Sequence, residues 1–249
     1  AALAGACARH GTVLAGGDLA ALPEPGASGG PHLAAGLTLI GRMPPGGAWL
    51  ARGAARPGDA LWVGGTLGES AAGRHLLARG ARLAGRRVEL PESLGLSAPL
   101  AVAARRAVRR HLAPVPQLEL GHALGRRAAR CPGHPPAAID LSDGLARDLH
   151  RLCAASGAGA VVEAERLPLP RGFAALCARL GREPLELALG GGEDYVLLFT
   201  LPAREEPPPS FRCRQIGTIT AGRGVRLATG GRQQKLPPAG WDHLTAATT

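Results

Sequence analysis

The sequence predicts an α/β (α+β) fold, because short apolar runs of strand length alternate with segments in which apolar residues recur at helical spacing. Several of these runs lead into a glycine-containing turn, which lets the chain change direction before the next helix begins. The hydrophobic content of 45% is typical of a globular protein rather than a disordered one. The predicted strands are 12–15, 32–41, 60–63, 137–139, 158–163, 195–201 and two more after 211, and the predicted helices are 2–9, 69–80, 98–112, 121–130, 173–180 and one that begins at 145.

The first part of the chain carries an acidic turn. The strand at 12–15 is followed by Gly16-Gly17-Asp18, in which permissive glycines stand beside a carboxylate. The loop after it contains Gly26-Ala27-Ser28-Gly29-Gly30, a formal match to the nucleophile elbow, but prolines flank it where that motif needs a strand and a helix. Residues 44–55 are rich in glycine and proline, which predicts a linker.

The most informative stretch is Ala137–Asp148, where an apolar run leads into a turn that carries Asp140, Ser142 and Asp143. A helical repeat begins directly after it, so these side chains are placed at the carboxyl end of a strand, where open α/β folds bind ligands. Adjacent carboxylates repel each other and would be stabilised by a shared Mg²⁺. The alternative is that Ser142 or Asp143 only caps the helix.

A second informative stretch is Leu187–Leu201, in which three glycines precede Glu193 and Asp194. The glycines either bring the backbone close to a ligand or form an ordinary loop. Near the end of the chain, Trp241 is either a packing plug or a ligand contact.

Charge and composition exclude several classes of function. The net charge of +10 is weak evidence for an acidic partner, because the abundance of Arg, Gly, Pro and Ala indicates a compositional bias. With three Trp, three Phe and one Tyr there is no aromatic platform for bases, so nucleic acid is not expected as a partner. No apolar window approaches the ~20 residues of a membrane span. Five scattered cysteines without a Cys-x-x-Cys pair indicate a reducing, cytoplasmic environment.

The distribution of basic residues limits the chemistry further. A helix stripe of arginines is either a phosphate-binding patch or a solvated face; it consists of Arg105, Arg106, Arg109 and Arg110. Lys235 is the only lysine and lies far from any glycine-rich turn, which excludes a P-loop and leaves no lysine for Schiff-base catalysis. What remains is a series of acidic turns without thiol or imidazole ligands, and such oxygen-rich sites suit Mg²⁺. The residues alone therefore predict an enzyme that handles phosphate groups with Mg²⁺.

A series of short motifs resembles the thiamine-monophosphate kinase family of the aminoimidazole-ribonucleotide-synthetase-like superfamily. The motifs follow the family order across nearly the whole chain. They are Gly16-Gly17-Asp18, Arg56-Pro57-Gly58-Asp59, Gly65–Gly73, Arg110-His111-Leu112-x-Pro114-x-Pro116, Ala138–Leu145, Gly191–Tyr195 and Gly240-Trp241-Asp242-His243.

The resemblance implies a PurM-like two-domain architecture. Residues 1–43 would be the remnant of an amino-terminal nucleotide- and Mg²⁺-binding domain, 44–55 a linker, and 56–249 the carboxyl-terminal domain. The implied activity is ATP-dependent phosphorylation of thiamine monophosphate to thiamine diphosphate in the cytoplasm, by a protein that can form a homodimer. By position in the motifs, the resemblance implies Asp18, Asp140 and Asp143 as magnesium ligands, Gly17 and Ser142 as nucleotide contacts, and Glu193 and Trp241 as contacts to the thiamine substrate.

The chain also departs from the family pattern. The family's amino-terminal Gly-Asp-Asp and Ser-Thr-Asp motifs have no counterpart, which predicts an amino-terminally incomplete chain. Leu19, Ala20 and Ala21 stand where the family has two threonines and an arginine, and Gly47 and Gln117 replace arginines. Loss of an arginine removes a charge and a bidentate donor. These losses favour an alternative function, that of a non-catalytic or decayed relative acting as a ligand-binding or scaffold protein.

Overall fold

The computed structural model describes residues 2–17 and 36–241, and the chain divides into two units, Ala1–Arg42 and Met43–Thr249. In the first unit, helix α1 (Ala2–Arg9) forms as predicted. The strand predicted at 12–15 is wrong, because these residues are exposed and have no strand partner in the described part of the chain. Residues 36–41 of the strand predicted at 32–41 are likewise not in a strand, and 32–35 lie outside the described residues.

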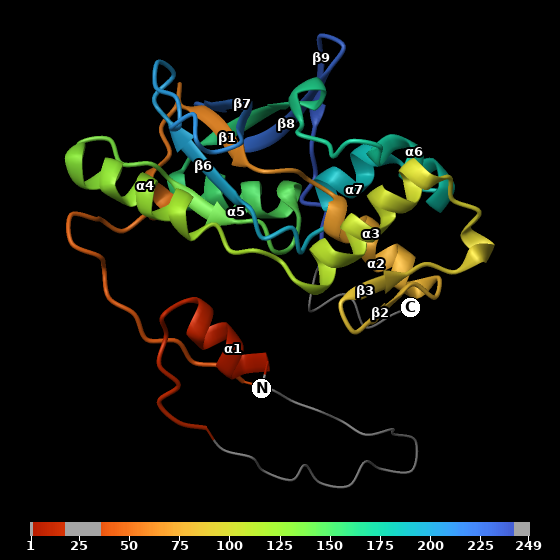
Figure 1. Ribbon diagram of the computed structural model, residues 1–249. Helices are drawn as coiled ribbons and strands as arrows, with labels where there is room; N and C mark the ends of the chain where they lie inside the picture. The colour runs from red at the N-terminus through yellow and green to blue at the C-terminus, as the bar shows by residue number, and fades with distance from the viewer. Residues whose placement is uncertain (1, 18–35, 242–249) are drawn as a thin grey trace, which may run out of the picture. The chain divides into compact units, whose positions relative to one another are not determined.

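The second unit is built on a seven-stranded sheet with the strand order β4-β6-β1-β7-β5-β8-β9 (Figure 1). Neighbouring strands are antiparallel except for the parallel pair β5 and β8. The fold is therefore of the predicted α/β (α+β) class, with a mixed sheet. The strands are β1 (Ala60–Gly64), β4 (Ala138–Asp140), β5 (Gly159–Glu163), β6 (Leu197–Leu201), β7 (Cys213–Thr220), β8 (Gly224–Thr229) and β9 (Arg232–Lys235).

Alternating side chains place separate apolar cores on the two faces of the sheet. On one face, Leu61 belongs to the core that contains the buried leucines of α5 (Leu145–Ser156). On the other face, Phe199 and the partly buried Trp62 pack with the leucines of α4 (Leu118–Arg130). Because β4, β6 and β1 lie side by side, their turns emerge at neighbouring positions on the edge of the sheet.

A third core lies beside the sheet, where α2 (Glu69–Ala78), α3 (Ala98–Leu112) and α6 (Phe173–Leu180) pack together (Figure 1). None of the helices in the described ranges is both long enough and apolar enough to cross a membrane. The remaining elements are α7 (Pro184–Gly190), the hairpin of β2 (Arg82–Ala84) and β3 (Arg87–Glu89), and the 3₁₀ helices Arg52–Ala54, Glu92–Leu94 and Ala164–Arg166.

Candidate functional site

The two acidic stretches of the sequence and the segment before the last described residue meet in space. The Glu193 amide donates to the carbonyl oxygen of Ser142 (2.7 Å), and the Tyr195 amide donates to that of Leu141 (2.8 Å). The Trp241 amide donates to the carbonyl oxygen of Asp143 (3.0 Å). Backbone hydrogen bonds therefore join the turn after β4, the glycine-rich loop before β6 and the carboxyl-terminal segment into one site.

Glycine is required where these segments touch. Gly192 has a φ of 67°, and a Cβ built there would lie 2.9 Å from the carbonyl oxygen of Ser142. Gly240 has a φ of 149°, and its Cβ would collide with the carbonyl oxygen of Asp143. The glycine triplet is thus explained by close backbone contact. Glu193 and Tyr195 also adopt positive φ values, of 57° and 47°, which is uncommon for residues with a side chain and is a feature of ligand-binding loops.

The turn after β4 is held by a carboxylate of α5 that the sequence analysis did not single out. Asp148 is fully buried and accepts hydrogen bonds from the backbone amides of Ser142 (3.1 Å) and Asp143 (3.0 Å). Arg151 binds both acids, at 2.7 Å from Asp148 and 2.5 Å from Asp143. Burial raises the pKa of Asp148, while these hydrogen bonds and the charge of Arg151 oppose the rise.

This geometry does not match the capping alternative. The residue that precedes α5 is Gly144, and no side chain caps the first turn of the helix. Asp143 is instead directed toward Arg151, and Ser142 contributes its backbone amide and carbonyl to the turn. The acidic turn therefore owes its shape to Asp148 and Arg151.

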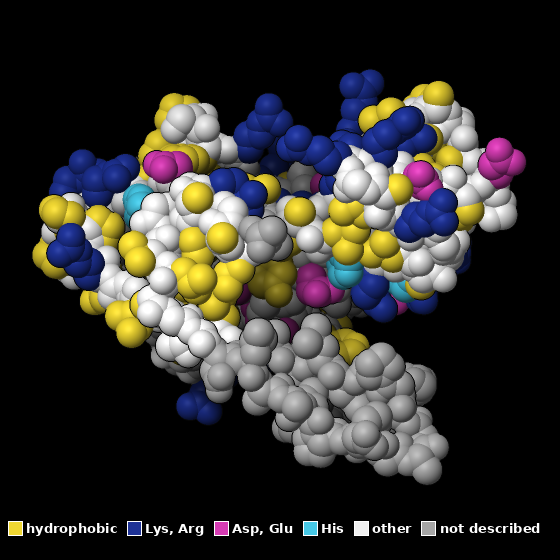
Figure 2. All heavy atoms as spheres, turned by 60° about the horizontal axis from the view of Figure 1, so that its bottom comes forward, with side chains coloured by type: hydrophobic (Ala, Val, Ile, Leu, Met, Phe, Trp, Pro, Cys, Tyr) yellow, Lys and Arg dark blue, Asp and Glu magenta, His cyan; other side chains and the backbone are white. Residues whose placement is uncertain are grey.

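The joined segments line a cavity of about 790 Å³. Ser142, Asp143, Glu193, Tyr195 and Trp241 all contribute to its wall. The Trp241 residue is 53% exposed, which does not fit the packing-plug interpretation, since a plug would be buried. On the face drawn in Figure 2, acidic side chains lie in a hollow near the centre, next to a histidine side chain.

Negative charge is concentrated around Tyr195. Burial and the nearby carboxylates of Glu193, Asp140 and Asp143 raise the pKa of its phenol. Asp140 is exposed at the end of β4. Carboxylate oxygens of this kind suit Mg²⁺, which needs only one or two of them when water and phosphate oxygens supply the other ligands. The described residues contain no group of three or more acidic, histidine or cysteine side chains that could hold a metal ion.

The neighbour of Glu193 has a different role. Asp194 is 3% exposed and accepts hydrogen bonds from the amides of Gly68 (2.6 Å) and Ser70 (3.1 Å) at the start of α2. Burial raises the pKa of Asp194 to about 6, against the opposing effects of these amides and of the positive charge of Arg110. Asp194 thus anchors the loop to α2, which leaves Glu193 to face the cavity.

His111, at the end of α3, is a functional candidate that the sequence analysis quoted only as part of a motif. Its Nδ1 lies 3.0 Å from the hydroxyl of the buried Ser70 and 3.5 Å from a carboxylate oxygen of Glu193. The imidazole can therefore orient the Glu193 carboxylate at the mouth of the cavity.

Comparison with known proteins identifies the family. Residues 56–229 match the family model described as "AIR synthase related protein, C-terminal domain". The chain belongs to the AIR synthase related family.

Several curated proteins that resemble the chain are thiamine-monophosphate kinases. The chain is 34% identical over 196 residues to that of Aquifex aeolicus (strain VF5), which covers 79% of this chain and 55% of the relative. It is 39% identical over 166 residues to that of Salmonella typhimurium (strain LT2), which covers 67% of this chain and 43% of the relative.

Solved structures agree with the sequence comparison. The thiamine-monophosphate kinase from Aquifex aeolicus aligns with a TM-score of 0.59 and 32% identity, over 75% of this chain and 54% of that one. A structure described as AaThiL complexed with AMPPCP and TMP aligns with a TM-score of 0.58 and 32% identity, over 79% of this chain and 54% of that one. The chain spans about half the length of the relatives that it matches.

The remaining predicted residues of this AIR synthase related chain belong to its first 42 residues. Gly17 is exposed and belongs to the first unit, and Asp18 lies outside the described residues, as do Leu19, Ala20 and Ala21.

The two positions at which this family member lacks an expected arginine have ordinary structural roles. The Gln117 amide accepts a hydrogen bond from the Leu197 amide (2.8 Å) and donates one to the carbonyl oxygen of Gly64, so it joins the end of β1 to the start of β6. Gly47 closes a turn by donating to the carbonyl oxygen of Pro44 (3.1 Å).

Proposed function

We propose that this chain takes part in the ATP-dependent phosphorylation of thiamine monophosphate to thiamine diphosphate. The observation that carries the proposal is the cavity of about 790 Å³ in which Glu193 and Trp241 lie together with the acidic turn after β4. The similarity to thiamine-monophosphate kinases supports it, since the same segments carry the motifs shared with that family.

The cavity suits a cationic heterocycle that bears a phosphate group. An exposed indole ring attracts a positively charged ring through cation–π contact, and the carboxylate of Glu193 adds electrostatic attraction. Ser70 holds the imidazole of His111 by a hydrogen bond, and His111 in turn contacts Glu193. These contacts would fix the orientation of the Glu193 carboxylate.

We further propose that Asp140 and Asp143 are magnesium ligands and that Ser142 contacts the nucleotide. The arrangement that supports this is the acidic turn whose backbone Asp148 holds in place. Mg²⁺, when bound, neutralises the charge of phosphate groups in phosphoryl transfer. We also propose Gly17 as a nucleotide contact and Asp18 as a magnesium ligand, as the resemblance of their motif to the kinase family implies.

A second candidate is a protein that binds the thiamine substrate without catalysis. The observation that favours it is that the Asp143 carboxylate is already paired with the guanidinium of Arg151, at 2.5 Å. On this alternative the glutamate, tryptophan and glycine framework of the cavity is retained and phosphoryl transfer is lost.

Calorimetric titration of the full chain with thiamine monophosphate tests the proposed binding. Replacement of Trp241 by alanine should weaken binding about 5- to 30-fold, since a partly desolvated cation–π contact contributes ~1–2 kcal/mol. The matched control is Trp49→Ala, because Trp49 is 75% exposed and does not line this cavity. Equal affinities for the two variants would contradict the proposed substrate contact.

A kinase assay with ATP and Mg²⁺ on the same preparations separates the two candidates. The kinase is supported if the unaltered chain forms thiamine diphosphate and the Asp140→Asn variant forms it more slowly. Binding without turnover supports the non-catalytic alternative.

A further inference from the structure

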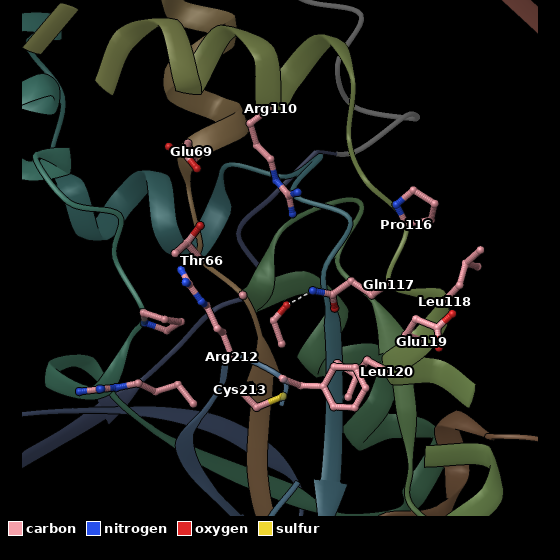
Figure 3. Close-up of a pocket in the computed structure, with 15 residues that line it drawn as sticks. Thr66, Glu69, Arg110, Pro116, Gln117, Leu118, Glu119, Leu120, Arg212 and Cys213 are labelled. Atoms are coloured by element: carbon pink, nitrogen blue, oxygen red, sulfur yellow. Dashed lines mark hydrogen bonds between the residues drawn. The ribbon is translucent and has the colours of Figure 1, made fainter. Parts of the chain in front are cut away.

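A second cavity, of about 750 Å³, opens at the carboxyl end of β1. It is lined by the turn after β1, the start of α4 and the start of β7, and it shares no lining residue with the cavity described above (Figure 3). Some of its residues, among them Gly65, Thr66 and Arg110, belong to the motifs that resemble the thiamine-monophosphate kinase family, but the proposed function does not use this cavity. Its walls therefore have to be interpreted from their own chemistry.

Arginine side chains enter this cavity from opposite sides. Arg110 extends from α3, and Arg212 extends from the segment before β7 toward Thr66 (Figure 3). One nitrogen of Arg110 donates to the carbonyl oxygen of Asp194 (2.7 Å). Its Nε is buried and has no hydrogen-bond partner among the described residues. A buried donor that lacks an acceptor is costly, and an anion in the cavity would supply one.

The turn after β1 adds further donors. Thr66 presents its hydroxyl to the cavity beside Arg212 (Figure 3). The turn keeps its compact path because Gly65 has a φ of 132° and because a Cβ at Gly64 would press against the side chains of α4. A glycine-rich turn with a hydroxyl group, facing planar guanidinium groups, is suited to phosphate oxygens.

The acidic residues of the wall do not cancel this charge. The carboxylate of Glu69 is already paired with Arg106 and is largely buried. Glu119 lies on the side of the cavity opposite Arg212 (Figure 3). Phe211, Leu120 and Pro116 add apolar side chains to the lining of the cavity.

We propose that this second cavity binds a phosphate monoester, with the phosphate group between Arg110, Arg212 and Thr66 and an apolar group against Phe211. The ligand class follows from the combination of guanidinium and hydroxyl donors with an adjacent apolar surface. Inorganic phosphate has the oxygens that bind guanidinium and hydroxyl groups but lacks the apolar group. Its binding can therefore be distinguished from that of a phosphate monoester.

The test uses the full chain in a phosphate-free buffer of low ionic strength, with inorganic phosphate and phenyl phosphate as probes. Titrations followed by two-dimensional NMR should shift the amide signals of Gly65 and Thr66, and phenyl phosphate should bind more tightly than inorganic phosphate. Arg212→Gln should weaken the binding of phenyl phosphate about 5- to 20-fold, as expected for loss of a charge-assisted hydrogen bond at an exposed arginine.

The matched control is Arg226→Gln, which removes the same charge from an exposed position on β8. Its affinity for phenyl phosphate should remain that of the unaltered chain. Unshifted Gly65 and Thr66 signals, or equal losses in the two variants, would overturn the site. Equal affinities for inorganic and phenyl phosphate would overturn the assignment to a monoester. Because Arg212→Gln leaves the first cavity intact, failure here is distinguishable from failure of thiamine-monophosphate binding.

Discussion

Replacement of Asp194 by asparagine isolates the effect of a carboxylate that is buried against the start of α2. Its side chain accepts hydrogen bonds from the amides of Gly68 (2.6 Å) and Ser70 (3.1 Å), which favour the charged form. Burial favours the neutral form and prevails, so the pKa rises from the ordinary 3.8 to about 6. The folded protein therefore holds this proton more tightly than the unfolded chain does.

The pH dependence follows from that difference. The contribution of Asp194 to stability is fully present below about pH 4 and is lost as the pH rises through about 6. The difference in pKa corresponds to about 3 kcal/mol. Asparagine resembles the neutral acid at every pH. The free energy of unfolding of Asp194→Asn, minus that of the unaltered protein, should therefore increase by about 2 kcal/mol between pH 4 and pH 7, because at pH 4 part of the ~3 kcal/mol has already been lost.

Urea denaturation followed by circular dichroism at pH 4, 5, 6 and 7 measures this difference, and subtraction removes the contributions of all other titrating groups. Glu206→Gln is the matched control, because it makes the same change from carboxylate to amide at an exposed position. If the Asp194→Asn difference is constant, or changes in favour of the unaltered protein as the pH rises, the amides of α2 and the charge of Arg110 outweigh burial and the reasoning fails.

Three further substitutions test the framework of the site by urea denaturation. Arg151→Ala should lower the free energy of unfolding by about 1–3 kcal/mol, because it leaves the buried Asp148 without its counter-ion; the loss stays in this range because Arg151 is partly exposed and solvent screens its charge. A change below about 0.5 kcal/mol, which is usual for surface substitutions, would contradict this role. Gly240→Ala should cost about 1–3 kcal/mol, because an alanine at its φ of 149° collides with the carbonyl oxygen of Asp143, and unaltered stability would show that the contact is loose. Gln117→Ala should cost about 1–3 kcal/mol by leaving a partly buried carbonyl and amide between β1 and β6 unpaired, whereas Gln117→Glu, which retains only the acceptor, should have a stability between those of Gln117→Ala and the unaltered protein.

Much of the fold could be predicted from the sequence where the local pattern is strong. The strand, acidic turn and helix at 137–152 form as predicted, and so do α3 and α6, because each has a clear apolar face. The prediction fails at 12–15, where the short segment expected to be a strand has no partner strand in the described part of the chain. The β2–β3 hairpin was missed because its mostly exposed, charged residues carry no apolar pattern. Strand pairing depends on contacts across the chain that a local pattern does not contain.

The site could be predicted in its segments but not in the division of labour among its acids. In the sequence, Glu193 and Asp194 are acids of one turn that residue type alone does not distinguish, and the same is true of Asp140 and Asp143. The structure separates them by burial and by partners that come from other elements: the amides before α2 take Asp194, and Arg151 takes Asp143. Neither partner is recognisable from the acidic motif itself, so spacing alone does not distinguish Asp194, which anchors a loop, from Glu193, which lines the cavity.

Asp148, which organises the turn after β4, is the site residue that the sequence indicates least clearly. Asp148 lies among the buried positions of α5, where an acid usually signals either an error in the predicted helix or a partner. Besides Arg151, its partners are the backbone amides of Ser142 and Asp143. Every sequence possesses backbone amides, so no residue type indicates these two contacts. The same holds for the amides of Glu193, Tyr195 and Trp241, which bind carbonyl oxygens of the same turn. Because these contacts are made by backbone groups, the only sequence signals for them are the glycines that permit the close approach. A cavity assembled in this way is therefore indicated in the sequence by glycine next to an acidic residue, although the sequence does not give its geometry.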